Sequence, residues 1–244
     1  MSTINFLKNP TTKLLINHAL CHLMLIPAFI YGEWWMFVLS FLWWQMVAIV
    51  SISAGYHRYY SHGAFKAGKF YEIIVNVMGI FSGAGPALTW AATHKQHHAY
   101  SDTNLDPHSY EHKGMFSVYV NTWGYNAFIK RQYIKRLMKN DILVWFYKNF
   151  YKVNVGIALG FLLIDPLFFV FGYAVPVVFA FHGYGILNIL GHKNAKPTNS
   201  PISNILTAGE GWHANHHKHP GTYYIGEKWW EFDPTKYFIM LIRK

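Results

Sequence analysis

Apolar residues along this chain are grouped into long blocks that polar segments separate. The first block holds two runs, residues 14–31 and 34–55, and only Gly32-Glu33 divides them. Each run is long enough to cross a hydrocarbon core of about 30 Å as a helix. Trp34 and Trp35 beside the turn fit the aromatic belt found where helices meet lipid headgroups. The pattern therefore predicts a membrane-spanning helical hairpin.

A second apolar block, from about Trp145 to Leu190, is roughly two crossings long. Asp165-Pro166 is its best internal break, because both residues favour turns over helix interiors. We expect spans over residues 145–164 and 167–192, with Pro176 kinking the later one. A break near Gly172 to Pro176 is the alternative division.

Residues 70–92 are also apolar enough to form a span. A crossing there would separate His57 and His62 from the histidines that begin at His94 by the thickness of the membrane. We predict instead a buried or interfacial helix that ends near Gly83-Ala84-Gly85-Pro86, whose glycines and proline mark a break.

The composition agrees with a membrane protein. Apolar residues make up 52% of the 244 residues and charged residues only 13%, against about 25% charged in soluble domains. The net charge of +10 does not indicate nucleic acid, because the aromatic residues lie in apolar runs and not along a basic stripe. Anionic lipid or an acidic partner fits better. The single cysteine, Cys21, excludes a disulfide framework and a thiolate iron–sulfur site.

The Lys and Arg residues indicate the topology, because positive charge accumulates on the cytoplasmic flanks of spans. Of 21 such residues, two precede Leu14, twelve lie between Tyr56 and Lys152, and seven follow His192. We therefore expect an all-α, multi-pass integral membrane protein with four transmembrane helices in two hairpins. Residues 56–144 and 193–244 would form a cytoplasmic helical cap, and 1–244 a single domain. Both termini would be cytoplasmic, and the polar start predicts no cleavable signal.

Eight of the fifteen histidines fall in three clusters within the expected cap. The clusters read His57-Arg-Tyr-Tyr-Ser-His62, His94-Lys-Gln-His97-His98 and His213-Ala-Asn-His216-His217. The second and third have offsets i, i+3 and i+4, so on a helix each cluster is expected to aim three imidazoles at a common point. His57 and His62 are about 140° apart on an ideal helix, so the helix must end or bend between them. Asn188 and His192 stand at i and i+4 near the end of the last span.

Nine imidazoles exceed the four to six or so ligands of one ion, which implies two metals. The set lacks the Glu-x-x-His pairs of soluble di-iron carboxylate bundles and the cysteines of structural zinc sites. Two irons with open positions could bind dioxygen and generate an oxidant strong enough to take hydrogen from an unactivated methylene.

In these motifs the chain resembles the membrane-bound fatty acid desaturases, nearest to the acyl-CoA desaturase branch and its short bacterial and phage-type relatives. The resemblance runs from about Leu14 to Asp233 and is carried by Gly55-Tyr-His57-Arg-Tyr-Tyr-Ser-His62, His94-Lys-Gln-His97-His98 with Ser101-Asp-Thr-Asn-Leu-Asp-Pro-His108-Ser, Asn188-Ile-Leu-Gly-His192 and Gly209-Glu-Gly-Trp-His213-Ala-Asn-His216-His217. Ala214 and His219 depart from the residues usual in the family, but neither removes a ligand.

The resemblance implies a di-iron centre, with Asn188 holding a water near one iron, and an acyl chain in a kinked tunnel beneath the metals. The implied ligands are His57, His62, His94, His97, His98, His192, His213, His216 and His217. It also implies O2-dependent insertion of a cis double bond into a long fatty acyl chain, linked to coenzyme A or to lipid. We expect no fused electron carrier, so a ferredoxin or a cytochrome b-type protein would supply two electrons.

Two alternatives stay open from sequence. The first is an alkane, sterol or carotenoid hydroxylase of the same histidine-rich superfamily, and the second is a membrane metal transporter or metal-binding protein. His108, His112, Asp106 and Glu210 are candidates to orient ligand imidazoles. His18, His22 and His182 are read as packing or interfacial residues. The basic run from Lys130 to Lys139 is read as an interfacial helix on anionic lipid.

Overall fold

A computed structural model describes residues 10–124 and 128–244, and over these ranges the regular structure is helical. The part of the expected cytoplasmic N-terminus in residues 1–9 lies outside the described residues. The elements, in chain order, are α2 (Pro10–Leu23), α3 (Leu25–Tyr31), α4 (Trp34–Val47), η1 (Ala48–Ser61), α5 (Lys69–Met78), η2 (Gly79–Ser82), α6 (Ala87–Tyr100), α7 (Tyr110–Lys113), α8 (Met115–Val120), α9 (Arg131–Lys135), η3 (Leu137–Lys139), α10 (Asp141–Ile164), α11 (Pro166–Phe169), η4 (Val170–Ala174), α12 (Val175–Leu190), α13 (Pro201–Leu206), α14 (His213–Lys218) and α15 (Pro234–Ile242).

The first predicted hairpin is present. Helices α2 and α3 form one apolar helix over Thr11–Tyr31, and α4 with η1 forms another over Trp34–Ser61, six residues longer than the expected end at residue 55. At the turn, a Cβ on Gly32 would lie 2.3 Å from the ring of Phe171 and from the carbonyl oxygen of Ala28. The turn therefore needs glycine because neighbouring chain packs directly against it.

The second block divides at Asp165, as predicted. The Asp165 carboxylate accepts the backbone N–H of Leu167 at 2.7 Å and caps α11, and the helix then continues unbroken over Pro166–Leu190. The alternative break at residues 172–176 is therefore wrong. The expected disturbance at Pro176 takes the form of the π-helical turn η4 just before it.

The carbonyl oxygens at this disturbance are satisfied from the first hairpin. Pro176 has no N–H to donate to the carbonyl of Gly172, four residues earlier. That carbonyl accepts the indole N–H of Trp43 at 3.1 Å, and the Phe171 carbonyl accepts the Ser40 hydroxyl at 2.5 Å. The π-helical turn in this apolar helix is thus stabilised because side chains of α4 take the place of the missing backbone bond.

The number of spans rests on three continuous apolar helices and one bent pair. Helix α10 ends at Ile164 as expected, but Lys148 and Lys152 make its first half polar, so its crossing of the membrane stays a prediction. The pair Lys69–Ser82 and Ala87–Tyr100 is bent by 81°. The break at residues 83–86 is therefore confirmed, with Gly83 and Gly85 at positive φ.

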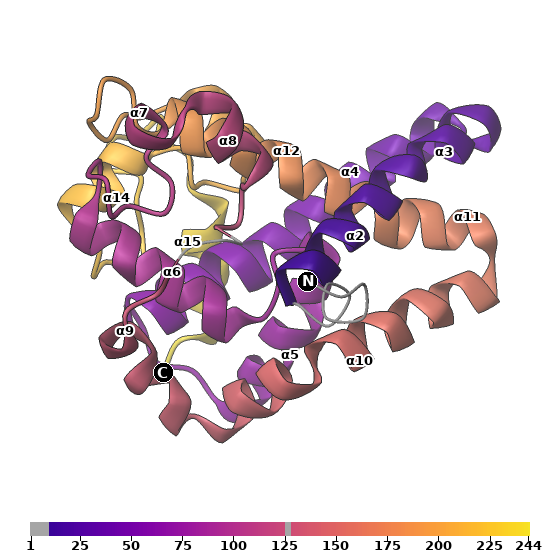
Figure 1. Ribbon diagram of the computed structural model, residues 1–244, viewed down its shortest axis with the longest axis horizontal. Helices are drawn as coiled ribbons and strands as arrows, with labels where there is room; N and C mark the ends of the chain where they lie inside the picture. The colour runs from indigo at the N-terminus through magenta and orange to yellow at the C-terminus, as the bar shows by residue number, and fades with distance from the viewer. Residues whose placement is uncertain (1–9, 125–127) are drawn as a thin grey trace, which may run out of the picture.

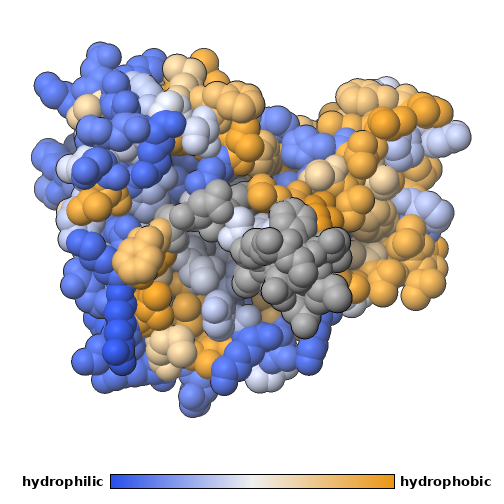
Figure 2. All heavy atoms as spheres, viewed as in Figure 1, coloured by the Kyte–Doolittle hydropathy of each residue, from blue (hydrophilic) through white to orange (hydrophobic). Residues whose placement is uncertain are grey.

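The molecule has one apolar and one polar end. In Figure 1 the turns at α3 and α11 occupy one end, and α7 and α14 occupy the other. Figure 2 shows hydrophobic residues gathered at the α3 and α11 end and hydrophilic residues covering the opposite end. This polarity fits a membrane protein whose helical spans carry a polar cap.

Candidate metal centre

The nine predicted histidines meet at the polar end in two groups. Within each group, one nitrogen from every imidazole lies within 4.8 Å of the others. The first group, called group one here, is His57, His62, His94, His98 and His216, and the second, called group two, is His97, His192, His213 and His217. The sequence therefore identified every member of both groups.

Group one has the spacing of ligands around a single ion. The Nε2 atom of His216 lies 2.8 Å from the Nε2 atoms of both His57 and His98. The Nε2 atom of His94 lies 3.0 Å from those of His62 and His98. Two nitrogens that bind one ion at about 2.1 Å and at right angles lie about 3.0 Å apart. The five imidazoles of group one therefore fit a single metal ion.

Group two has similar but slightly wider spacing. The Nε2 atom of His213 lies 2.9 Å from that of His192 and 3.1 Å from that of His217. The His97 and His217 Nε2 atoms are 3.3 Å apart. Four imidazoles of this kind form a second site able to hold a metal ion.

Hydrogen bonds at the far side of three rings show why a cation fits. The Nδ1 atom of His97 lies 2.8 Å from an Asp106 oxygen, that of His192 lies 3.1 Å from both Asp102 oxygens, and that of His57 pairs with Glu210. A carboxylate only accepts, so Nδ1 carries the proton and Nε2 presents a lone pair. Three Nε2 lone pairs are thus directed at neighbouring imidazole nitrogens 2.8 to 3.3 Å away, and a donor set of this kind fits a metal.

Charge on the other rings is also suppressed. Burial, together with neighbouring imidazoles, lowers the pKa of His213 and of His216 well below the usual value. Burial alone would raise the pKa of Glu210, but His57 and Arg58 outweigh it and the pKa falls to about 2. The lowered pKa values favour neutral imidazoles at His213 and His216, which is the protonation state that metal binding requires.

The expectation that each cluster aims at one point is wrong. On α6, His94 and His98 belong to group one and His97 to group two. On α14, His213 and His217 belong to group two and His216 to group one. On a helix with 3.6 residues per turn, position i+4 is rotated by about 40° from position i in one direction, and position i+3 by about 60° in the other. Positions i and i+4 therefore point more nearly the same way than positions i and i+3. Each of the two helices therefore contributes to both groups.

His57 and His62 are brought together by a wider helix. The segment η1 is π-helical over Ala48–Ser61, and the N–H of His62 donates to the carbonyl of His57 at 3.1 Å. In a π turn the hydrogen bond joins residues five apart, so these two positions stack on the same side. The helix does end between them, as predicted, but the π turns rather than a bend align the rings.

Asn188 lies beside group two. Its amide N–H donates to the carbonyl of Thr122 at 2.9 Å, and it lines a chamber of about 40 Å³ together with His97, His192 and His213. The side chain is thus held in place at the edge of the centre.

Two of the carboxylates were predicted and one was missed. Asp106 and Glu210 contact imidazoles of the two groups, and His108 packs against His97 with ring centroids 5.6 Å apart. Asp102 was missed because its partner His192 is 90 residues away in sequence. Its positive φ of 61° suits the tolerance of aspartate for the left-handed region, but nothing in the sequence reveals that conformation.

Arg58 was also missed as a member of the site. Only 1% of its side chain is exposed, and its guanidinium lies 2.8 Å from Asp233 and 3.1 Å from Glu210. Glu210 in turn accepts a hydrogen bond from Ser53. Arg58 therefore fixes the carboxylate that orients His57, and its place between two histidines of one cluster was the available signal.

The histidines read as packing residues lie apart from both groups. The Nε2 atoms of His22 and His182 are 3.2 Å apart, which joins α2 to α12. The Tyr119 hydroxyl lies 2.7 Å from Nδ1 of His182, and His18 lies 2.9 Å from the carbonyl of Gly83. These rings make hydrogen bonds between helices.

An Asp102→Asn variant is expected to bind metal about 10- to 100-fold more weakly and to lose activity in proportion. The amide keeps the shape but no longer provides a charged acceptor for the His192 Nδ1–H. Metal titration of the purified protein measures the change. Glu111→Gln, at an exposed position on α7, is the matched control and should bind metal normally. Equal affinity in the two variants would contradict the orienting role.

Comparison with known proteins identifies the family. The model of the fatty acid desaturase family matches residues 32–234. The chain is 29% identical over 235 residues to an acyl-CoA 5-desaturase of Anemone leveillei, covering 91% of this chain and 73% of that protein. It is also 29% identical over 228 residues to the sn-1 stearoyl-lipid 9-desaturase of a Synechocystis strain, covering 88% and 71%. The chain belongs to the fatty acid desaturase family, whose members are oxidoreductases that act on fatty acyl chains.

Proposed function

We propose that this desaturase holds two irons and uses dioxygen and two electrons to remove two hydrogens from adjacent methylenes of a long acyl chain. The observation that carries the proposal is the convergence of nine Nε2 atoms into two groups in a chain of this family. The irons would supply the oxidising chemistry. All nine histidines, from His57 to His217, are the proposed ligands, and Asn188 is proposed to hold a water beside group two.

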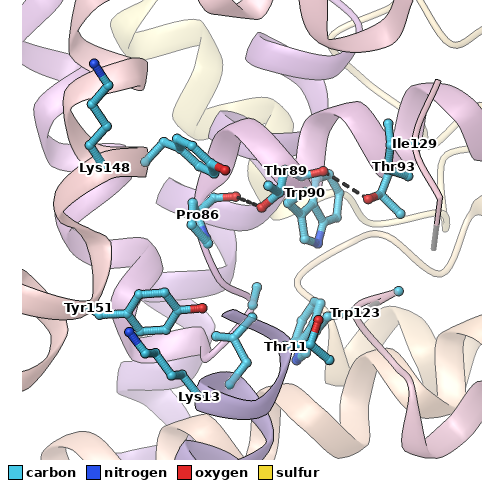
Figure 3. Close-up of a pocket in the computed structure, with 14 residues that line it drawn as sticks. Thr11, Lys13, Pro86, Thr89, Trp90, Thr93, Trp123, Ile129, Lys148 and Tyr151 are labelled. Atoms are coloured by element: carbon cyan, nitrogen blue, oxygen red, sulfur yellow. Dashed lines mark hydrogen bonds between the residues drawn. The ribbon is translucent and has the colours of Figure 1, made fainter. Parts of the chain in front are cut away.

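A cavity beside the metal centre supports the acyl substrate. It has a volume of about 470 Å³, and its lining includes Leu14, Pro86, Trp90, Trp123 and Tyr151. Figure 3 shows Trp90 and Trp123 facing into it, with Lys13 and Tyr151 on another side. The apolar side chains Leu14, Pro86, Trp90 and Trp123 provide surface of the kind that binds a hydrocarbon chain.

The same cavity shares two lining residues with the chamber at the metal centre. Trp90 and Trp123 also line the chamber that contains His94, His97 and Asn188. The Trp90 ring stacks on that of His94 at 5.0 Å between centroids. We propose that the acyl chain passes between these two tryptophans, which exclude water and hold a methylene under the imidazoles.

The proposal extends to the headgroup to which the acyl chain is attached. We propose acyl-CoA as the first candidate substrate and a lipid-linked acyl chain as the second. Lys13 and Lys148 at the cavity provide positive charge for a phosphate of either headgroup. The electron donor is proposed to be a separate ferredoxin or cytochrome b-type protein that docks on the cap. The cap and both termini are proposed to be cytoplasmic, from the distribution of Lys and Arg.

The rival from the same superfamily is a hydroxylase, since both reactions begin with abstraction of one hydrogen. A metal transporter would need polar ligands across the bilayer midplane, whereas all nine histidines lie in groups at one end of the spans. The relatives carry names of desaturases, which favours the alkene as product.

The test is expression in a host with simple lipids, followed by mass-spectrometric location of any new double bond. We expect a cis alkene in a long acyl chain, and none with His94→Ala. A hydroxylated product would select the hydroxylase. Uptake of zinc or manganese with unchanged lipids would contradict the enzyme.

A further inference from the structure

The last helix is apolar on both of its faces. In α15, Ile239 is fully buried and packs into the core, while Tyr237, Met240 and Leu241 are 55%, 48% and 86% exposed. The three exposed positions follow the i, i+3, i+4 spacing of one helix face. A polar cap would ordinarily turn charged residues outward there, so this face is suited to an apolar surrounding.

The loop before α15 extends the same surface. Trp229, Trp230 and Phe232 are 91%, 55% and 61% exposed. The rings of Phe232 and Tyr237 lie 6.0 Å apart between centroids, which joins the loop to the helix. We call this surface the C-terminal aromatic patch, and its members are Trp229, Trp230, Phe232, Tyr237, Met240 and Leu241.

Two lysines lie against aromatic rings of the patch. The Lys228 ammonium lies 5.3 Å from the ring centre of Trp230, and that of Lys236 lies 5.7 Å from the ring centre of Tyr237. Lysine stems cover apolar surface while the ammonium reaches water or phosphate. Tryptophan and tyrosine flanked by lysine are typical of segments at the level of lipid headgroups.

Contacts of α15 place the patch near the inner end of a span. The Phe238 ring lies 6.1 Å from that of Tyr71, and the Tyr71 hydroxyl donates to the carbonyl of Val50 at 2.9 Å. Val50 lies in the apolar helix Trp34–Ser61, on the membrane side of His57. Helix α15 is thus linked through Tyr71 to the part of this apolar helix that precedes His57.

Helix α13 contacts both α4 and the loop that carries the patch. The Phe232 carbonyl accepts the Asn204 amide at 2.9 Å, and the Leu206 carbonyl accepts the Trp44 indole N–H at 3.0 Å. On the same helix, Ile202 and Ile205 are 63% and 66% exposed. Helix α13 therefore adds exposed apolar side chains between its contacts with α4 and with the loop that carries the patch.

We propose that the C-terminal aromatic patch lies in the headgroup layer of the bilayer that the helices cross, so that α15 is an interfacial anchor for the cap. The anchor is tied to the metal centre, because Asp233 caps α15 through the N–H of Lys236 at 3.1 Å and also pairs with Arg58 at 2.8 Å. Arg58 follows the ligand His57, so contact with lipid holds the metal-bearing helix at a fixed depth. The anchor rests on the apolar helices and does not depend on the desaturase chemistry.

The depth of the patch is measurable with spin labels in vesicles of phosphatidylcholine and phosphatidylglycerol. Cys21 is buried and is left in place, and the variants Trp229→Cys, Tyr237→Cys and Leu241→Cys are labelled singly. We expect relaxation by dissolved oxygen to exceed that by a water-soluble nickel chelate, as at the lipid reference Leu42→Cys. The aqueous reference is Lys193→Cys, at an exposed position beyond the last span.

A nickel response equal to that of Lys193→Cys would overturn the anchor. Shielding from both reagents would also overturn it, because that result indicates a protein partner or a second copy on the patch. As a second arm, adding Trp229→Glu and Leu241→Glu to Tyr237→Cys should raise the nickel response several-fold, since charge expels the segment from lipid. An unchanged response would show that these side chains do not hold the segment in lipid.

Discussion

A His216→Ala variant is expected to yield no detectable desaturated product and to lose roughly one bound iron per chain. His216 is 1% exposed, and its Nε2 atom lies 2.8 Å from those of His57 and His98. Removing it takes one proposed ligand from group one, and the proposed ion would lose a nitrogen that lies next to those of two other histidines. Ligand loss of this kind exceeds the 10- to 100-fold or so effect of changing an orienting partner. Iron analysis of the purified protein, with product measured by mass spectrometry, checks both parts.

The control for this prediction lies on the same segment. His219 has a side chain that is 54% exposed and is 3.9 Å from Glu227, outside both groups. His219→Ala should therefore keep full iron content and full activity. A second comparison separates the groups, because His213→Ala should deplete group two while group one keeps its five histidines. Full activity in His216→Ala would remove this residue from the metal centre.

The sequence predicted most of the fold because the spans are signalled locally. Apolar runs of fixed length predicted the hairpin at Gly32-Glu33 and the division at Asp165-Pro166, and both are present. The π-helical turns were beyond the sequence, since an apolar run gives no sign of whether its bonds join residues four or five apart. The bonds from Trp43 and Ser40 that stabilise the π turn before Pro176 depend on how two distant helices pack.

The candidate site was predictable in membership but not in arrangement. Clustering identified eight of the nine histidines, because so many imidazoles at helix spacing have few other uses, and His192 was added from its i, i+4 relation to Asn188. Their division between two groups depends on how α6 and α14 face each other. The periodicity of one helix does not predict how that helix packs against another. Asp102 and Arg58 were missed for a related reason, since each acts through a residue far away in sequence.

Arg58 provides the positive charge that pairs with two carboxylates beside the site. Its guanidinium pairs with two buried carboxylates, Glu210 and Asp233, and also donates to the carbonyl of Tyr223 at 2.8 Å. The carboxylates are 4% and 2% exposed at their side chains. Glu210 orients His57 and Asp233 caps α15. One planar cation therefore connects the metal-bearing helix to the last helix, and lysine cannot reproduce that geometry because its ammonium is a single point charge.

An Arg58→Leu variant is expected to lower the free energy of unfolding by about 3–5 kcal/mol, because it leaves two buried carboxylates without their cation. Thermal unfolding of the purified protein in one detergent measures the loss, with Arg131→Leu, at an exposed position on α9, as the matched control that should unfold like the wild type. The free energy of unfolding of Arg58→Lys should fall between those of Arg58→Leu and the wild type. Lysine restores the positive charge but not the planar guanidinium that donates to both carboxylates. Adding Glu210→Gln and Asp233→Asn to Arg58→Leu should recover part of the stability, because the unpaired charge is then gone while the weakened orientation of His57 remains. If Arg58→Leu unfolds like Arg131→Leu, the buried pairs do not stabilise the cap, and the connection from α15 to the metal centre would have to rest on packing alone.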